Sequence, residues 1–204
     1  MNAGKLNPLV ETINTLFHFF ILNLVFLLTC IPVFTVGTAL SSLYYVIIKE
    51  TKGEAGYLVR PYLREFKRNF KNATIAFLIL SLIGALLLFN LLFWPVQGNP
   101  FSYVITGVLA VIAVVWLAVS HYTYPLIGRF VNTPLHSIRN AWGLVLRNLK
   151  QTLGLLLIDA GVAVFYLFFP LKVVLLLVPI CGFVVPVYWR SKILVGVFAP
   201  YEKQ

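Results

Sequence analysis

The sequence predicts an all-α fold, a polytopic transmembrane helical bundle of about six spans with two amphipathic basic helices on its cytoplasmic side. Hydrophobic residues make up 60% of the 204 residues and charged residues only 11%, whereas soluble domains have roughly 45–50% apolar and about 25% charged residues. The charged residues also gather between apolar runs that are long enough to cross a bilayer. We therefore treat residues 1–204 as a single integral membrane domain.

The first apolar run is too long for one crossing and predicts two. Residues 12–48 carry no charge, and as a single helix these 37 residues would extend about 55 Å, against a hydrocarbon core of roughly 30 Å. Pro32, Thr35 and Gly37 predict a break in this run, which gives spans at about 12–31 and 36–48. The second span is short, so a re-entrant segment is the alternative. No small-residue cleavage site follows the run, so we expect a retained anchor rather than a signal peptide.

A basic helix is predicted next, over residues 59–72. Its cations recur at helical spacing on one face, and apolar side chains recur on the other, at Val59, Leu63, Phe66 and Phe70. Such a helix lies at the membrane interface, where each cation contributes about 1 kcal/mol of attraction to anionic headgroups. A solvated helix in a loop is the alternative. The cations expected to contact lipid are Arg60, Arg64, Lys67, Arg68 and Lys71.

The rest of the chain predicts four more spans and a second basic helix. The apolar segments lie at about 73–94, 102–127, 152–169 and 173–188, and the last is followed by the basic segment 189–192. Residues 132–150 combine cations with an apolar stripe made of Leu135, Ile138, Trp142, Val145 and Leu149. We expect this second amphipathic helix to contact anionic headgroups through Arg139, Arg147 and Lys150.

The distribution of cations predicts the orientation in the membrane. With six spans, fifteen of the sixteen Lys and Arg residues fall on one side and only Lys172 falls on the other. Since cytoplasmic loops carry the excess of Lys and Arg, both termini are expected in the cytoplasm. The net charge of +10 is explained by these loops, and no nucleic-acid-binding motif accompanies it. Nucleic acid is therefore not an expected partner.

Two stretches of the chain resemble each other at a separation of 79 residues. Residues 68–72 (RNFKN) align with residues 147–151 (RNLKQ), and the same offset aligns 41–48 with 120–127 without a gap. The aligned units, 41–80 and 120–159, each run from a span through a basic helix into another span. We interpret them as a parallel internal repeat.

Three motifs near the start of the chain carry a resemblance to a known family. The turn CIPVFTVG (residues 30–37), the aromatic pair Tyr44 and Tyr45, and the block REFKRNFKNAT (residues 64–74) are similar to the YesL-like family of bacterial integral membrane proteins. Arg68 stands at a variable position of that block. The resemblance spans the chain and is strongest over its first 75 residues.

The resemblance implies a role rather than a reaction. The molecular activity of the YesL-like family is uncharacterised, and its members are typically encoded beside genes for carbohydrate ABC importers in Gram-positive bacteria. A protein of the bacterial plasma membrane that is accessory to carbohydrate uptake is therefore expected, with importer permease subunits or copies of itself as partners. No catalytic residue, metal or cofactor is expected.

The search for chemistry in the sequence leads to one intramembrane site. No nucleophile elbow, zinc-protease, Walker or dinucleotide motif is present, so an enzyme is not expected. Asp159 lies well inside a predicted span, where an ionisable group costs at least about 2.5–3.5 kcal/mol, so a partner or an aqueous cavity is expected. A small solute transporter or channel, lined by Asp159 and its polar neighbours, is the alternative function.

His121 is the predicted partner of Asp159. His121 lies eight residues before Arg129 and Asp159 lies nine residues after Lys150, or about 12 and 13.5 Å along their helices, so the two are level. We predict that they pair, either as a structural clasp or as the start of a proton-coupled site. Asn23 and Asn90 are predicted to form interhelical hydrogen bonds.

The charge distribution gives a direct test of topology. An alkaline-phosphatase fusion at Gly98, in the uncharged turn, should be active, and fusions at Asn69 or Asn148, beside the basic segments, should be inactive. Enzyme activity of the three fusions at equal expression measures this. An active fusion at Asn69 would contradict the predicted orientation.

Overall fold

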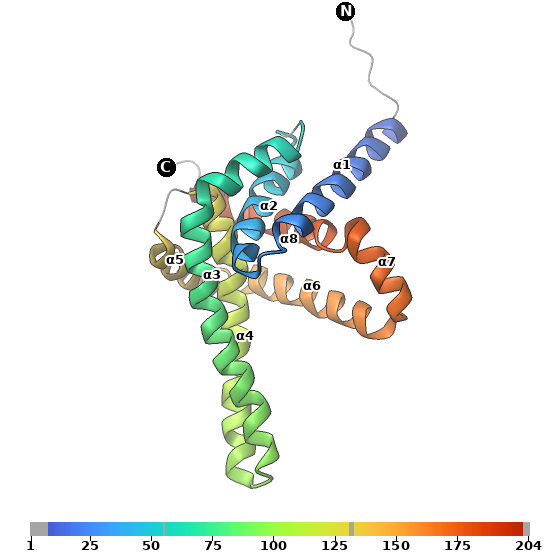
Figure 1. The fold of residues 1–204 in the computed structure, drawn as a ribbon. Helices are drawn as coiled ribbons and strands as arrows, with labels where there is room; N and C mark the ends of the chain where they lie inside the picture. The colour runs from blue at the N-terminus through green and yellow to red at the C-terminus, as the bar shows by residue number, and fades with distance from the viewer. Residues whose placement is uncertain (1–7, 55, 131–132, 202–204) are drawn as a thin grey trace, which may run out of the picture.

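The structure, a computed structural model, describes residues 8–54, 56–130 and 133–201, with side chains from Asn14 onward. The described residues form eight α-helices and two short 3₁₀ helices and include no strand, which confirms the all-α fold class (Figure 1). The elements in chain order are α1 Pro8–Thr29, η1 Val33–Thr35, α2 Val36–Thr51, α3 Val59–Val96, α4 Pro100–Arg129, α5 Pro134–Arg147, α6 Leu149–Phe168, α7 Leu171–Cys181, α8 Val184–Phe198 and η2 Ala199–Tyr201.

Fewer helices than predicted are long and apolar enough to cross a membrane. Among the described residues α3, α4 and α6 meet this condition, and α7 with α8 would form a fourth span if the pair, bent by 59°, is counted as one. The apolar part of α1, Asn14–Thr29, is short, and α2 with its 16 residues extends only about 24 Å. The chain is that of a membrane protein, but six spans are not confirmed.

The turn between α1 and α2 explains why residues 12–48 do not form the two full spans that the sequence predicts. Thr35 Oγ1 donates to the carbonyl oxygens of Thr29 and Pro32, both at 2.5 Å, and so closes the turn. A Cβ atom on Gly37 would lie 2.4 Å from Phe77 Cβ and 2.7 Å from the Ala73 carbonyl oxygen, so α2 packs directly on α3 there. The turn is therefore level with the start of the predicted span 73–94. This depth favours the re-entrant alternative over two full crossings by residues 12–48.

Helix α3 joins two predicted elements into one. The basic helix 59–72 and the span 73–94 form a continuous helix of 38 residues that bends in its first half (Figure 1). Leu63 and Phe70 of the predicted apolar stripe are exposed, while Val59 and Phe66 are partly buried. The buried face of α3 lies about a quarter turn around the helix from this stripe, packs against α2 and α4, and consists of Tyr62, Glu65, Asn69, Ala73, Ala76 and Leu80.

Helix α2 lies at the centre of the core. It contacts α1, α3, α4 and α8, and its Leu43 and Ile47 are fully buried. Two helical hairpins extend from this centre: α3 and α4 run down together, and α6 leads outward to α7 (Figure 1). The apolar residues of α2 are therefore shielded by protein, whereas those of the two hairpins face outward.

The predicted sixth span is broken, and Asn23 of α1 binds the break. Asn23 Nδ2 donates to the carbonyl oxygens of Val178, at 2.8 Å, and Pro179, at 2.7 Å. Its Oδ1 accepts from the backbone N–H groups of Phe183, at 3.1 Å, and Val184, at 3.3 Å. These four groups belong to the end of α7 and the start of α8, where helix termini leave backbone groups without helical partners, although the Val178 carbonyl oxygen also accepts from Gly182 N–H at 3.1 Å.

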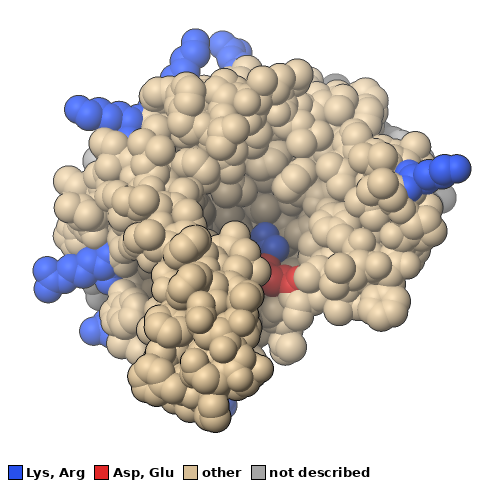
Figure 2. All heavy atoms as spheres, turned by 60° about the horizontal axis from the view of Figure 1, so that its bottom comes forward, with Lys and Arg blue, Asp and Glu red and all other residues tan. Residues whose placement is uncertain are grey.

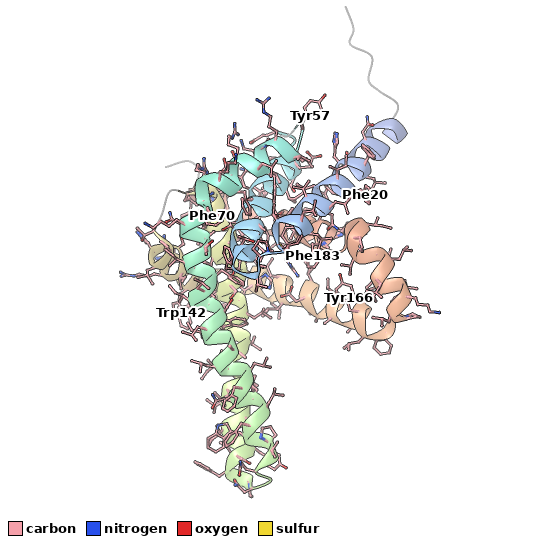
Figure 3. The ribbon with its side chains drawn as sticks, viewed as in Figure 1. Phe20, Tyr57, Phe70, Trp142, Tyr166 and Phe183 are labelled. Carbon is pink, nitrogen blue, oxygen red and sulfur yellow. The ribbon has the colours of Figure 1, made fainter. Side chains whose placement is uncertain are left out.

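Packing around this break involves aromatic side chains from two other helices (Figure 3). Tyr166 of α6 donates from its hydroxyl to the Gly182 carbonyl oxygen at 3.2 Å, and the Phe183 ring lies 5.2 Å from the ring of Phe26 in α1. The interhelical role predicted for Asn23 is thus confirmed. The same prediction for Asn90 is wrong, because Asn90 donates to Leu86 within α3 and accepts from Trp94 of the same helix.

The internal repeat stays a prediction. The units 41–80 and 120–159 both contain a helix that is followed by a basic helical segment and then an apolar helical segment. They differ at the aligned segments RNFKN and RNLKQ, since α3 is continuous there while Asn148, with φ −126° and ψ 50°, separates α5 from α6.

We expect Gly37 to be required for the packing of α2 on α3. In Gly37→Val the new side chain would overlap Phe77 and the backbone of Ala73, so the free energy of unfolding should fall by about 1–3 kcal/mol. Thermal unfolding of the purified protein in detergent measures the change. Gly107→Val is the matched control, because a Cβ atom at Gly107 would meet nothing within 4 Å. Equal stabilities of the two variants would contradict this packing.

Candidate functional site

Three ionisable side chains from three helices meet inside the bundle. Asp159 lies on α6, His121 on α4 and Arg190 on α8, and these side chains are 13–18% exposed. His121 Nε2 forms a hydrogen bond with Asp159 Oδ2, and Arg190 Nη2 donates to Asp159 Oδ1. Both carboxylate oxygens therefore bind nitrogen groups of neighbouring helices. The structure brings His121 and Asp159 together, in agreement with their equal depths in the sequence.

A fourth helix joins the site through Tyr44 of α2. This tyrosine is almost fully buried, and its hydroxyl interacts electrostatically with the Arg190 guanidinium, which lines the same cavity. We call Tyr44, His121, Asp159 and Arg190 the Asp159 cluster. Nearby, the hydroxyl groups of Tyr122 and Thr152 lie 3.1 Å apart and join α4 to α6 a second time. The cluster thus lies where α2, α4, α6 and α8 converge.

Sequence reasoning missed Arg190. The segment 189–192 was counted as a cytoplasmic end, but α8 continues through it to Phe198, so Arg190 lies within a helix and not after one. The signal that could have found it is the run Ile193–Ala199, which is uncharged and apolar and so continues the helix beyond the cations. A buried carboxylate also requires a cation within reach.

A cavity of about 550 Å³ adjoins the Asp159 cluster. Figure 2 looks onto this end of the molecule and shows a hollow in which acidic and basic atoms lie near each other, whereas the other visible Lys and Arg side chains project around the outline. The cavity lies between α2, α3, α4 and α8. Its walls are formed by Leu40, Tyr44, Phe77, Leu80, Ser81, Gly84, Ala85, Leu88, Trp116, Leu117, Ser120, His121, Tyr124 and Arg190.

Most of the cations predicted to contact lipid lie on the outside of the molecule. Their contact with lipid headgroups stays a prediction, because exposure on the protein surface is necessary for such contact but does not demonstrate it. The residues with exposed side chains are Arg60, Arg64, Lys67, Lys71, Arg139, Arg147 and Lys150. On α5, Trp142 of the predicted apolar stripe is exposed as well, whereas Val145 is buried (Figure 3).

Arg68 differs from the other cations in how closely it contacts the protein, although Arg64 Nε also lies 4.0 Å from Glu65 Oε1. Its Nη2 lies 2.5 Å from Glu65 Oε2, and the Glu65 side chain is only 1% exposed. The same nitrogen donates to the Gly128 carbonyl oxygen at 3.4 Å, and the guanidinium lies 5.8 Å from the centre of the Tyr45 ring. Arg68 therefore connects α3 to α2 and α4, and half of its side chain remains available to headgroups.

Comparison with known proteins gives one match. Residues 19–91 match the model of a family described as "Protein of unknown function, DUF624". This segment covers the second half of α1, all of α2 and nearly all of α3, and it includes Tyr44 but none of the other residues of the Asp159 cluster. No curated protein and no solved structure matches the chain. The description of the matched family does not mention the YesL-like family. A domain of unknown function is nevertheless consistent with the resemblance to that family.

The pairing of Asp159 with Arg190 can be measured by a double-mutant cycle. Asp159→Asn or Arg190→Gln alone leaves the other group without its charged partner, so each should lower the free energy of unfolding by about 1–3 kcal/mol. The double variant should lose less than the sum of the two. Denaturant unfolding in detergent gives these values, with Arg60→Gln as an exposed control. Strictly additive losses would contradict the pairing.

Proposed function

We propose that this chain is an accessory membrane subunit, without a catalytic step, that acts through helix–helix contacts in the bacterial plasma membrane. The partners are the permease subunits of a carbohydrate ABC importer, as the family resemblance implies, and both termini face the cytoplasm. A matching family of unknown function is consistent with this role and does not establish it.

The observation that carries the proposal is the hairpin of α3 and α4. It extends well beyond the rest of the bundle (Figure 1), and past their contact at Gly84 and Trp116 the two helices run about 18 Å in α3 and about 24 Å in α4. The side chains of this part are apolar and exposed, among them Leu86, Phe89, Val108 and Val111. A hairpin that crosses the membrane with little cover from its own chain is well suited to receive helices of another protein.

One face of α4 suits a close approach by another helix. Gly107, Ala110, Val111 and Val114 follow each other at helical spacing, and all of them are exposed. A Cβ atom at Gly107 would meet nothing within 4 Å, so the backbone is open on that side. Small residues at helix interfaces in membranes allow backbones to approach closely and thereby gain van der Waals contact.

The two basic segments support the same role. The exposed cations at the start of α3 and on α5 offer attraction to anionic headgroups, and they would hold the subunit at a fixed depth. A fixed depth in the membrane would place the α3–α4 hairpin level with the helices of a partner protein.

A second candidate function is a small solute transporter or channel in its own right. The observation in its favour is the cavity beside the Asp159 cluster, because ionisable residues inside a membrane domain often mark a solute or proton pathway.

Co-purification tests the accessory role. The tagged protein should recover importer permeases from its own host membranes, and Gly107→Ile should reduce that recovery several-fold by keeping the helices apart. Gly196→Ile is the matched control, since Gly196 is exposed on α8 and also has open space around it. Purification without permeases, together with solute movement in liposomes, would contradict the accessory role and support the second candidate.

A further inference from the structure

The cavity beside the Asp159 cluster has a polar end and an apolar end. Tyr44, His121, Tyr124 and Arg190 line it where α2, α4 and α8 meet. Gly84, Ala85, Leu88, Trp116 and Leu117 line it along the hairpin, and these residues lie toward the hairpin tip in both α3 and α4. The volume of about 550 Å³ falls within the roughly 300–1,000 Å³ of small-molecule sites.

The charges that line the cavity favour an anion. Arg190 and His121 are both lining residues, and no acidic side chain is among the described residues of the wall. Asp159 binds Arg190 and His121 but does not line the cavity. A ligand in the cavity would therefore contact the guanidinium and the imidazole, and the Asp159 carboxylate that both groups bind lies beside it but is not part of the wall.

The Arg190 guanidinium has hydrogen-bonding capacity to spare. An arginine side chain carries five N–H donors. Asp159 and Tyr44 are its partners, and Arg190 Nε is buried with no acceptor among the described residues. Because Nε is itself closed off, an anion in the cavity would accept from the parts of the guanidinium that line the wall, in surroundings where charge-assisted hydrogen bonds are strong.

We propose that this cavity binds a single-chain amphiphile with one carboxylate, whose headgroup meets Arg190 and His121 and whose apolar chain lies along α3 and α4. The apolar end requires the chain, because a small anion would leave Leu88, Trp116 and Leu117 without contacts. The inference is independent of the accessory role, since it concerns a ligand of the bundle and not a partner of the hairpin.

Quenching of Trp116 fluorescence by a brominated ligand tests this proposal. The variant Trp94→Phe/Trp142→Phe/Trp189→Phe keeps Trp116, which lines the cavity, as its one tryptophan. The purified full-length variant in detergent is titrated with 12-bromododecanoate and with 12-bromododecanol at alkaline pH, where the carboxylate is ionised. We expect saturable quenching, with the carboxylate binding at least tenfold more tightly than the alcohol.

Two further variants and one control separate the contribution of the Arg190 charge to binding from the contribution of the apolar end of the cavity. Asp159→Asn/Arg190→Gln removes the cation without leaving an unpaired carboxylate, and it should abolish the preference for the carboxylate. Ala85→Phe narrows the apolar end without changing any charge, and it should weaken 12-bromododecanoate binding at least tenfold. Ala110→Phe, an exposed site nearer the hairpin tip, should leave binding unchanged.

Several results would overturn the proposal. Equal affinity for the carboxylate and the alcohol would mean that Arg190 does not recognise the headgroup. Displacement of 12-bromododecanoate by acetate at the same concentrations would mean that the apolar chain contributes nothing. If the charge-neutral variant does not fold, the comparison of Ala85→Phe with Ala110→Phe still decides, because equal binding in those two variants places the ligand elsewhere.

Discussion

A carboxylate inside an apolar helical bundle is the constraint on which the arrangement of the helices depends. An unpaired Asp159 would cost several kcal/mol in low dielectric, so α6 must cross the bundle where cationic and hydrogen-bonding groups can reach it. His121 reaches it from α4 and Arg190 from α8, and Arg190 in turn binds Tyr44 on the central helix α2. One residue therefore fixes the relative heights of four helices, which apolar packing alone would leave free to slide.

Two glycines and the side-chain amide of Asn23 also fix how the helices pack. Gly37 brings α2 against α3, and Gly128 brings α4 so close to α2 that a Cβ atom there would lie 2.6 Å from the Ser41 carbonyl oxygen. Asn23 binds the exposed backbone groups between α7 and α8, so the chain can bend by 59° inside an apolar environment. Backbone that departs from helix geometry in a membrane needs such partners, because lipid offers no hydrogen bonds.

The sequence predicted the all-α fold class, because its composition is typical of long apolar helices. It also predicted that His121 meets Asp159, because the constant rise per residue of an α-helix places the two side chains at equal depth. It did not predict how far residues 12–48 enter the membrane. The break at Pro32 and Gly37 was visible, but the depth of the turn depends on the packing of Gly37 against Ala73 and Phe77, which no local pattern contains. Arg190 was missed for a related reason, since a count of cations treats each one as a loop residue and cannot recognise one that binds a distant carboxylate.

The stability of the bundle does not by itself explain the Asp159 cluster. Apolar residues of similar volume often stabilise a protein interior as well as a buried ion pair does, or better, because the desolvation cost of the charges is avoided. Leucines could therefore hold α2, α4, α6 and α8 together with equal stability, although they would not fix the relative heights of these helices. What leucines would lack is a guanidinium and an imidazole in the wall of a cavity that has no acidic side chain among its described lining residues. The cluster is thus better explained by recognition of a ligand, with alignment of the helices as the condition that keeps the site in shape.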